Sequence, residues 1–338
     1  MNQYDALAVQ AKGLEHHRHI EGFRERLWQA TSPLPGSTPY RRQREFSVTG
    51  AYDDRTLGGF LTARFGHVGE HKWRIEVESG RVQLEGRPER NWDIRVRSGM
   101  RLHHDIGMVT EPDISTDIAV LYNDEHFIAL NKPAPLAVHP SGRFLKNTLI
   151  PILEAVLPNV KLRPPHRLDA DTSGVQLLGK TRQAAAQLSH QFAVRAVTKQ
   201  YLAQVEGHPE IDTWRVDSEI GRNRGRTGRR DVEPGDAALT SFHCLHRHAN
   251  GRSLVLATPK TGRTNQIRLH LKDCGHPICG DPIYGSLVND HSESQTFTHG
   301  TLELHAFTLE FKHPIMKHSM RLVAPCPKWA NESQTGTG

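Results

Sequence analysis

The sequence predicts an α+β protein whose main domain is a mixed, largely antiparallel sheet with flanking helices. Across residues 118–326, short apolar segments typical of strands outnumber segments with helical periodicity. The region shows no regular alternation of strand and helix, which a parallel sheet would require. At 338 residues the chain is long enough for two domains and a sizeable core.

Residues 1–45 are expected to form a basic N-terminal extension and linker. Apolar spacing over residues 14–30 favours a helix, and three prolines within residues 31–39 mark a linker. Three arginines follow within residues 41–44. Because apolar periodicity is not sustained through this segment, we expect a mobile basic arm.

Residues 46–105 are predicted to be a small α+β domain. Apolar residues over 57–65 predict a short helix, and the alternation at Val82 and Leu84 predicts a strand that ends in a turn. The order around residues 80–86, GRVQLEG, resembles the small RNA-binding module shared by a ribosomal small-subunit protein and many RNA-modifying enzymes. That resemblance implies contact with RNA. A small domain without RNA contact is the alternative.

The main domain is expected to open with two strands, a rigid loop and a helix. The strands are predicted over 118–122 and 127–130, and prolines fix the loop at residues 132–140. The helix covers residues 148–156, with Asn147 as its N-cap. The remaining elements are a strand over 175–178, a helix over 182–195, and strands over 201–205, 239–245, 254–258 and 302–307.

The charge of the chain favours a polyanionic partner. The formal net charge is +6 and the isoelectric point is about 9.2. Residues 221–230, GRNRGRTGRR, contain no apolar side chain and are expected to form a loop. Such a loop could simply be solvated, but on RNA its arginines would neutralise several phosphates and act as a clamp. The clamp arginines are Arg222, Arg224, Arg226, Arg229 and Arg230.

The sequence predicts neither a membrane span nor a metal site. No apolar run approaches the ~20 residues that a spanning helix needs, and the N-terminus lacks the pattern of a secretory signal. A cytoplasmic protein without a membrane partner is therefore expected. Two of the four cysteines, Cys274 and Cys279, lie near His270, but their spacing does not suit zinc. Ordinary thiols in a reducing compartment are expected instead.

Four stretches of the main domain form a set. Residues 132–140 read KPAPLAVHP, residues 166–174 read HRLDADTSG and residues 199–207 read KQYLAQVEG. Residues 259–285 contain PKTGRTNQIRLH, GHPI and GDPIYG in that order. In identity, order and spacing, these stretches resemble the RluA-type pseudouridine synthases, and the resemblance covers residues 118–326.

The resemblance implies a pseudouridine-synthase-type fold with a central RNA cleft. It also implies an isomerase, of the intramolecular transferase kind, that converts specific uridines to pseudouridine in structured ribosomal or transfer RNA. Uridine is detached from its ribose, turned over and rejoined through carbon 5. Because this involves no redox step and no energy input, no cofactor is expected. RNA is the expected partner, no obligatory protein partner is predicted, and residues 327–338 would be a flexible tail.

Three residues would carry this chemistry. Asp169 would stay ionised beside the ribose and either attack the anomeric carbon or remove the 2′ proton, and both routes stay open. Arg268, expected in a strand or at a strand end, would keep that carboxylate ionised through its planar guanidinium. Tyr201 would stack on the uracil, a contact worth about 1–3 kcal/mol, and its phenol is a candidate base for the carbon 5 proton. The nearby Asp171 is expected to structure the loop.

Five further residues are expected to contact RNA or to shape the cleft. Arg167 would lie near the flipped nucleotide, and Thr172 would shape the catalytic loop. Lys199 is expected to be structural or to face a phosphate, and Arg263 to contact phosphate or order the cleft floor. Asn265 stands where the family commonly has His, so it keeps a hydrogen-bonding role but not proton transfer.

Two other functions compete with this prediction. A catalytically silent RNA-binding or RNA-folding factor could use the same scaffold, but it would not need Asp169, Tyr201 and Arg268 together. A metal-dependent nucleic-acid enzyme would need clustered carboxylates and histidines, which the four stretches do not supply.

Overall fold

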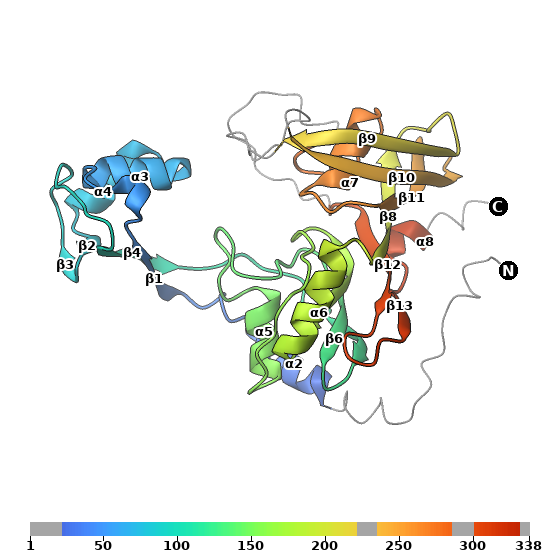
Figure 1. Cartoon of the computed structure of the whole chain (residues 1–338), viewed down its shortest axis with the longest axis horizontal. Coiled ribbons are helices and arrows are strands. Elements are labelled where there is room, and N and C mark those ends of the chain that lie inside the picture. The colour runs from blue at the N-terminus through green and yellow to red at the C-terminus, as the bar shows by residue number, and fades with distance from the viewer. Residues whose placement is uncertain (1–21, 222–234, 286–300, 332–338) are drawn as a thin grey trace. The chain divides into compact units, whose positions relative to one another are not determined.

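The computed structural model describes residues 22–221, 235–285 and 301–331. Residues 36–112 form a small compact unit, and the chain before and after them forms a large one (Figure 1). The small unit starts earlier than the expected residue 46, because its first strand already pairs at Tyr40.

The small unit packs two helices against a four-stranded sheet with the strand order β1-β4-β2-β3. All three strand pairings are antiparallel. The helix predicted over 57–65 and the strand at Val82 and Leu84 are confirmed. The elements are β1 (Tyr40–Ser47), α3 (Leu57–Arg64), α4 (Glu70–Glu78), β2 (Val82–Leu84), β3 (Arg87–Pro88) and β4 (Arg101–Val109).

Helix α4 is not foreseen by the sequence pattern, because its apolar residues at 73, 75 and 77 alternate like those of a strand. In the helix, Trp73 and Val77 lie four residues apart and are buried, whereas Ile75 is 46% exposed.

A second aromatic residue fixes the position of α3. The indole of Trp92 packs directly on Gly58, where an added Cβ would lie 1.9 Å from it, so this position requires glycine.

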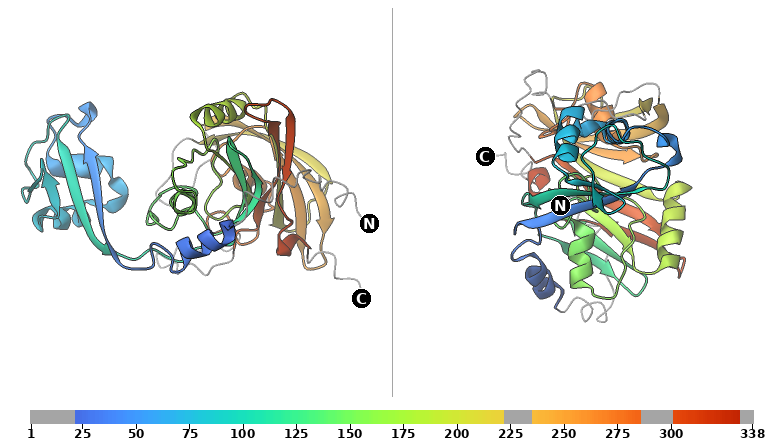
Figure 2. Two further views of the ribbon diagram at one scale, coloured as in Figure 1. Left: turned by 90° about the horizontal axis from the view of Figure 1, so that it is seen from below. Right: turned by 90° about the vertical axis from the view of Figure 1, so that its left-hand side faces the viewer.

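The large unit is built on a nine-stranded sheet with the order β5-β6-β7-β12-β8-β11-β10-β9, and β13 pairs with β12 (Figure 2). The pairing of β7 with β12 is parallel, and the others are antiparallel. The predicted mixed, largely antiparallel sheet is therefore confirmed. The strands are β5 (Ala119–Asn123), β6 (Phe127–Lys132), β7 (Ser173–Gly179), β8 (Thr198–Glu206), β9 (Thr213–Gly221), β10 (Gly235–Arg247), β11 (Arg252–Pro259), β12 (Leu304–Lys312) and β13 (Ser319–Val323).

Helices cover both faces of the sheet at its β5–β6–β7 end. Ile128 and Leu130 of β6 pack with α2 and α5, whereas Phe127 on the opposite face packs with α6. Farther along the sheet, α7 packs on β8 and β11 through Ile267 and Leu271. The helices are α2 (Phe23–Thr31), α5 (Leu149–Val156), α6 (Arg182–Ala193), α7 (Gln266–Asp273) and α8 (Lys328–Asn331).

Where the observed elements differ from the predicted ones, the causes are local. Thr148, not Asn147, is the N-cap of α5. A helix, α7, occupies the segment in which a strand or strand end was expected, because Ile267 and Leu271 lie one turn apart and pack together. Strands β9 and β13 are not foreseen by the sequence. The expected flexible tail contains α8, in which Ala330 is buried.

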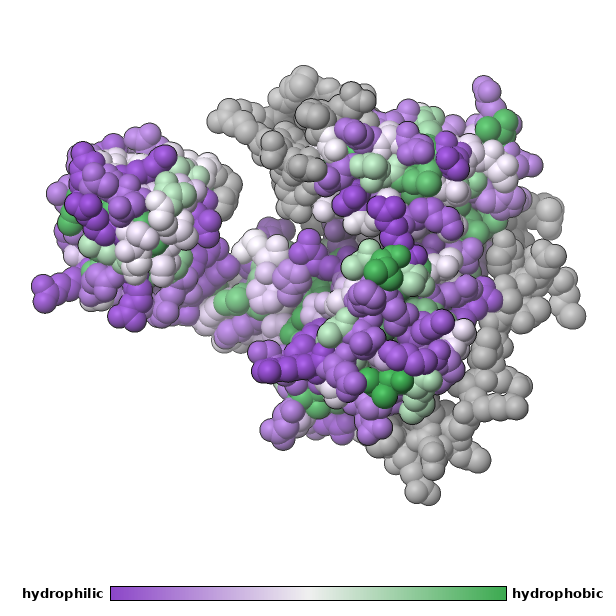
Figure 3. All heavy atoms as spheres, in the orientation of Figure 1, coloured by the Kyte–Doolittle hydropathy of each residue, from purple (hydrophilic) through white to green (hydrophobic). Residues whose placement is uncertain are grey.

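The face drawn in Figure 3 carries mostly hydrophilic residues, with apolar ones scattered among them. Within the described ranges, no helix has both the length and the hydropathy to cross a membrane.

All four cysteines are free thiols, two of them buried and two exposed. The part of the chain that the structure describes also contains no group of three His, Cys, Asp or Glu side chains arranged to hold a metal ion.

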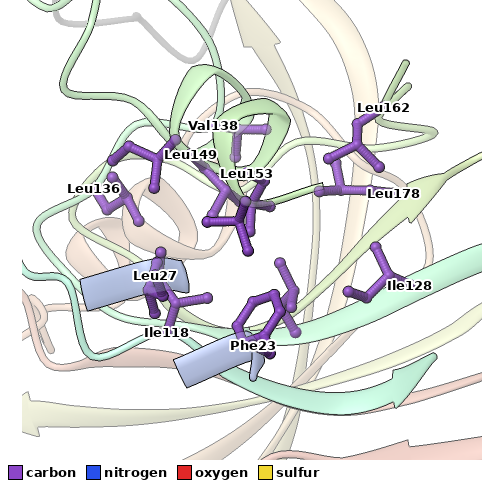
Figure 4. Packing of buried hydrophobic residues seen from close by; sticks show 13 residues of the cluster. Phe23, Leu27, Ile118, Ile128, Leu136, Val138, Leu149, Leu153, Leu162 and Leu178 are labelled. Carbon is purple, nitrogen blue, oxygen red and sulfur yellow. The ribbon is translucent and has the colours of Figure 1, made fainter. Parts of the chain in front are cut away.

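Helix α2 belongs to the core of the large unit. Phe23 and Leu27 are 3% and 7% exposed and lie among the buried side chains around α5 and β6 (Figure 4). Arg26 donates from Nε to the carbonyl of Val156, at the end of α5, over 3.1 Å. Residues 23–31 are thus a packed helix and not part of a mobile arm, because Phe23 and Leu27 form one apolar face.

Candidate active site

A cleft of about 690 Å³ opens in the large unit where three of the four predicted stretches meet. Its walls come from residues 165–172, from β8 and the turn before it, and from residues 259–268. The cleft brings together all the predicted site residues of the described chain, which are Arg167, Asp169, Thr172, Lys199, Tyr201, Arg263, Asn265 and Arg268.

The sheet brings the Asp169 loop close to Tyr201. The loop runs directly into β7, Tyr201 lies on β8, and β12 lies between these two strands. The parallel approach of β7 to β12 depends on Gly174, whose φ is +107° and whose added Cβ would lie 2.2 Å from the carbonyl oxygen of Ala306. The Thr-Ser-Gly turn therefore ends in glycine for a steric reason.

Asp169 faces the cleft with a cation beside it. Its side chain is 35% exposed, and Oδ2 lies 3.9 Å from a terminal nitrogen of Arg268. At this distance the two groups form an ion pair, but they are too far apart for a hydrogen bond. The carbonyl of Asp169 accepts from the backbone N–H of the buried Thr172 at 3.2 Å, which closes the loop.

Arg268 is held from behind by a second carboxylate. Its side chain is 4% exposed, and it donates from Nε and a terminal nitrogen to the two oxygens of Asp281 at 2.8 and 2.6 Å. Burial opposes the charge of Arg268, but the hydrogen bonds and charge of Asp281, with the charge of Asp169, raise its pKa above the usual value. Sequence reasoning assigned no role to Asp281. Its place in the GDPIYG stretch was the available signal.

A buried lysine ties the Asp169 loop to the proline-rich loop. The ammonium group of Lys132 donates to the carbonyls of Pro133, Leu136 and Ala170 at 2.9, 2.8 and 3.1 Å. Complete burial lowers the pKa of Lys132 to about 7, although the charges of the Asp171 and Asp169 carboxylates oppose the shift. Lys132 therefore links residues 132–136 to the Asp169 loop.

Two residues of β8 face the cleft with different environments. Burial, followed by the charge of Asp169, raises the pKa of Tyr201 well above its usual value, so its phenol stays protonated at neutral pH. Lys199 donates from Nζ to the carbonyl of Thr261 at 2.8 Å and thereby holds the segment before α7. Burial, with the nearby charge of Arg195, lowers the pKa of Lys199 to about 8.

The other predicted contact residues line the cleft with defined partners. A guanidinium nitrogen of the exposed Arg167 lies 3.1 Å from Nε2 of His139. Arg263 donates from Nε to the carbonyl of Ala237 at 3.3 Å. Asn265 is the N-cap of α7 with a φ of +59°, a left-handed conformation that Asn tolerates better than most residues. The five arginines proposed as a clamp lie outside the described residues.

Comparison with known proteins agrees with this geometry. A family model described as RNA pseudouridylate synthase matches residues 126–273. The ribosomal large subunit pseudouridine synthase C of Pasteurella multocida is 35% identical over 263 residues, which cover 75% of this chain and 79% of that protein. The protein of the same name from Escherichia coli (strain K12) is 34% identical over 262 residues, which cover 75% of this chain and 82% of that protein. Among solved structures, human RNA pseudouridylate synthase domain containing 1 is 29% identical with a TM-score of 0.53, covering 64% and 87%.

Proposed function

The chain belongs to the RNA pseudouridylate synthase family, and on that premise we propose that its substrate is a uridine of large-subunit ribosomal RNA. Family membership makes the protein an enzyme that isomerises uridine in RNA. The relatives from P. multocida and E. coli are named for the large ribosomal subunit, which supports this substrate over transfer RNA. The observation that carries the assignment of the site is the meeting of Asp169, Tyr201 and Arg268 in one cleft.

Asp169 begins the reaction in this proposal. Its carboxylate is open to the cleft and lies near a cation without being hydrogen-bonded to it, so its oxygens can approach a ribose. It either attacks the anomeric carbon as the uracil leaves, or removes the 2′ proton. Both routes need the ionised form, and the positive charge of Arg268 lies 3.9 Å from that carboxylate.

Tyr201 holds the uracil while it turns over. An aromatic ring can stack on any base, which suits a base that must rotate between two attachments. The raised pKa of Tyr201 opposes loss of its proton, so a role as base toward carbon 5 would require deprotonating a phenol that resists it. We therefore assign stacking as the main contribution of Tyr201.

The basic residues of the cleft wall bind the RNA backbone. Arg167 is exposed beside the catalytic loop and supports the flipped-out nucleotide, while Arg263 lies on the wall formed by residues 259–268. Lys199 and Asn265 chiefly hold the wall in place, since each bonds a neighbouring segment. The arginines within residues 222–230 add a phosphate clamp.

The small unit supplies further affinity for RNA. Its exposed side chains include Arg55, Arg64, Arg95 and Arg97, which suit phosphate contacts. The catalytically silent alternative is not favoured, because a binding factor would have no use for a paired carboxylate inside a cleft. We further propose that the enzyme acts in the cytoplasm without an obligatory protein partner.

A tritium-release assay tests the proposed substrate. Uridine carrying tritium at carbon 5 loses it when that carbon joins the ribose, so release into water counts conversions. Large-subunit ribosomal RNA and a transfer RNA pool are each transcribed with this label and incubated with the protein. We expect release from the ribosomal RNA at one or a few positions. Release from transfer RNA alone would overturn the proposed substrate.

A further inference from the structure

Asp281 forms a buried salt bridge with Arg268, and we infer that it is a positioning residue that acts on the isomerisation through Arg268. This inference rests on the proposed function, in which Asp169 begins the reaction beside Arg268. Asp281 does not line the cleft, whereas Asp169 and Arg268 both do. Its side chain contacts the cleft lining directly through the salt bridge to Arg268.

The carboxylate of Asp281 is fixed by its own turn. Its Oδ1 accepts from the backbone N–H groups of Ile283 and Tyr284 at 2.9 and 3.0 Å, and its side chain is 0% exposed. The N–H of Gly285 donates to the carbonyl of Asp281 at 3.1 Å. An added Cβ at Gly285 would lie 2.5 Å from that carbonyl oxygen, so the turn closes tightly around the acid.

The guanidinium of Arg268 is held on further sides. Asn265 accepts from its terminal nitrogen Nη1 at 3.2 Å through Oδ1, and donates from Nδ2 to the Tyr284 hydroxyl at 3.2 Å. The centroid of the Tyr284 ring lies 5.2 Å from the guanidinium carbon of Arg268. Since Asp281 takes Nε and the other terminal nitrogen, Nη1 is the part of the fork that lies toward Asp169.

This arrangement limits how strongly Arg268 pairs with Asp169. An arginine with a free fork binds a carboxylate through two parallel hydrogen bonds. Here the two parallel hydrogen bonds go to Asp281. Asp169 only forms an ion pair with Arg268, at 3.9 Å and without a hydrogen bond. Asp281 thus keeps the cation in place while leaving the oxygens of Asp169 available for the ribose.

Asp281→Asn separates the guanidinium contact from the turn. The remaining oxygen can keep the bonds to Ile283 and Tyr284, but the new amide nitrogen meets Nε–H of Arg268, donor against donor. We expect the single-turnover rate to fall by on the order of 10- to 100-fold with KM for RNA within about twofold, because a displaced group impairs chemistry more than binding. Asp212→Asn, which removes an exposed partner of Arg247, is the matched control and should keep the wild-type rate.

A double-mutant cycle decides whether Asp281 acts through Arg268. Arg268→Leu leaves the buried carboxylate of Asp281 without its cation, so this variant should melt at a lower temperature than wild type. Adding Asp281→Asn should restore much of the melting temperature and should not lower the rate further. If Asp281→Asn lowers the rate by the same factor with and without Arg268, the inference is wrong.

Asp281→Glu serves if Asp281→Asn does not fold, because it keeps the buried charge balanced. Its longer side chain displaces the guanidinium, and a folded variant with wild-type kcat would overturn the inference. Asp169→Asn in the same assay separates the two claims. Turnover by Asp169→Asn contradicts the proposed function, whereas an inactive Asp169→Asn beside a fully active Asp281→Asn contradicts the positioning role alone.

Discussion

The small unit and the large unit each contain an arginine–aspartate pair, but the first pair is exposed to solvent and the second is buried. In the small unit, Arg95 lies 3.3 Å from Asp54, and their side chains are 64% and 51% exposed. Beside the cleft, Arg268 lies 2.6 Å from Asp281, and their side chains are 4% and 0% exposed. Water screens the first pair, whereas burial and backbone hydrogen bonds fix the geometry of the second.

This difference indicates which charges of a basic protein take part in its chemistry. An exposed arginine keeps its freedom and suits phosphates of varied position, as RNA binding requires. A buried arginine has its orientation set by its partners and can place a charge beside one reacting group. The small unit is thus suited to affinity and the cleft to reaction, although both carry arginine and aspartate.

Among the changes that compare the two regions, the largest effect is expected from replacing arginine by lysine at both places. Arg268→Lys keeps a charge but loses the fork that binds Asp281, so the single-turnover rate should fall on the order of 100-fold. Arg95→Lys, the matched exposed change, should leave the rate as it is and alter stability by less than about 0.5 kcal/mol. Equal rates for the two variants would remove the distinction between the regions.

A smaller effect is expected from replacing residues 36–112 by a short Gly/Ser linker. The N–H of Glu111 bonds the carbonyl of Gly36 at 2.9 Å, so the two ends of the small unit are adjacent and a short linker can join them. Residues 22–35 must be kept, because α2 packs in the core of the large unit. Affinity for ribosomal RNA should weaken by about tenfold or more, as when one of two linked binding sites is lost.

A short labelled oligonucleotide is the control for this linker variant. Because the cleft lies wholly within the large unit, the oligonucleotide should be converted at nearly the wild-type single-turnover rate. Unchanged affinity for full-length ribosomal RNA would show that the small unit contributes no binding.

An acid sensitivity of the large unit is also expected, as an effect on stability and not on rate or affinity. Burial, with the charge of Lys199, lowers the pKa of His166 from 6.5 to about 3, and burial lowers that of His305 to about 4. The unfolded chain therefore binds more protons, so stability is present above pH 6.5 and is lost as pH falls from 6.5 toward 4. Hydrogen-exchange protection factors of β7 and β12 should fall over this window.

Glutamine replacements of these histidines check the cause of that loss. Replacing both His166 and His305 by Gln should flatten the pH dependence, whereas His243→Gln, which changes an exposed histidine of β10, should not. If protection of β7 stays constant from pH 7 to about 4 in the wild type, His166 and His305 do not control stability.

Much of the fold could be predicted from local sequence patterns. Strands with clear alternation and helices such as α6 follow from apolar spacing, because burial of one face decides their type. The sequence did not predict helix α4, because Trp73, Ile75 and Val77 alternate as in a strand, although Trp73 and Val77 alone also fit one face of a helix. The sequence did not predict helix α2 as a core element, because its buried apolar residues Phe23 and Leu27 pack with partners more than ninety residues later in the chain.

The sequence predicted residues that meet in one cleft, but it did not predict how their charges pair. The stretches that contain Asp169, Tyr201 and Arg268 indicated these residues, and the cleft brings them together. The expected partner of Arg268 was Asp169, yet its closest carboxylate is that of Asp281. Which carboxylate accepts both hydrogen bonds of the Arg268 guanidinium depends on how the turn at Asp281 packs against α7. Residue spacing in the sequence does not indicate this tertiary contact.

The most direct test compares two aspartates of one loop. Asp169→Asn and Asp171→Asn remove the same charge from positions two residues apart, and each is measured by tritium release under single turnover with enzyme in excess. RNA binding is measured in the same samples. We predict that Asp169→Asn binds RNA as wild type does and releases no tritium above background, while Asp171→Asn stays active. Substantial release by Asp169→Asn would contradict the assignment of the catalytic carboxylate.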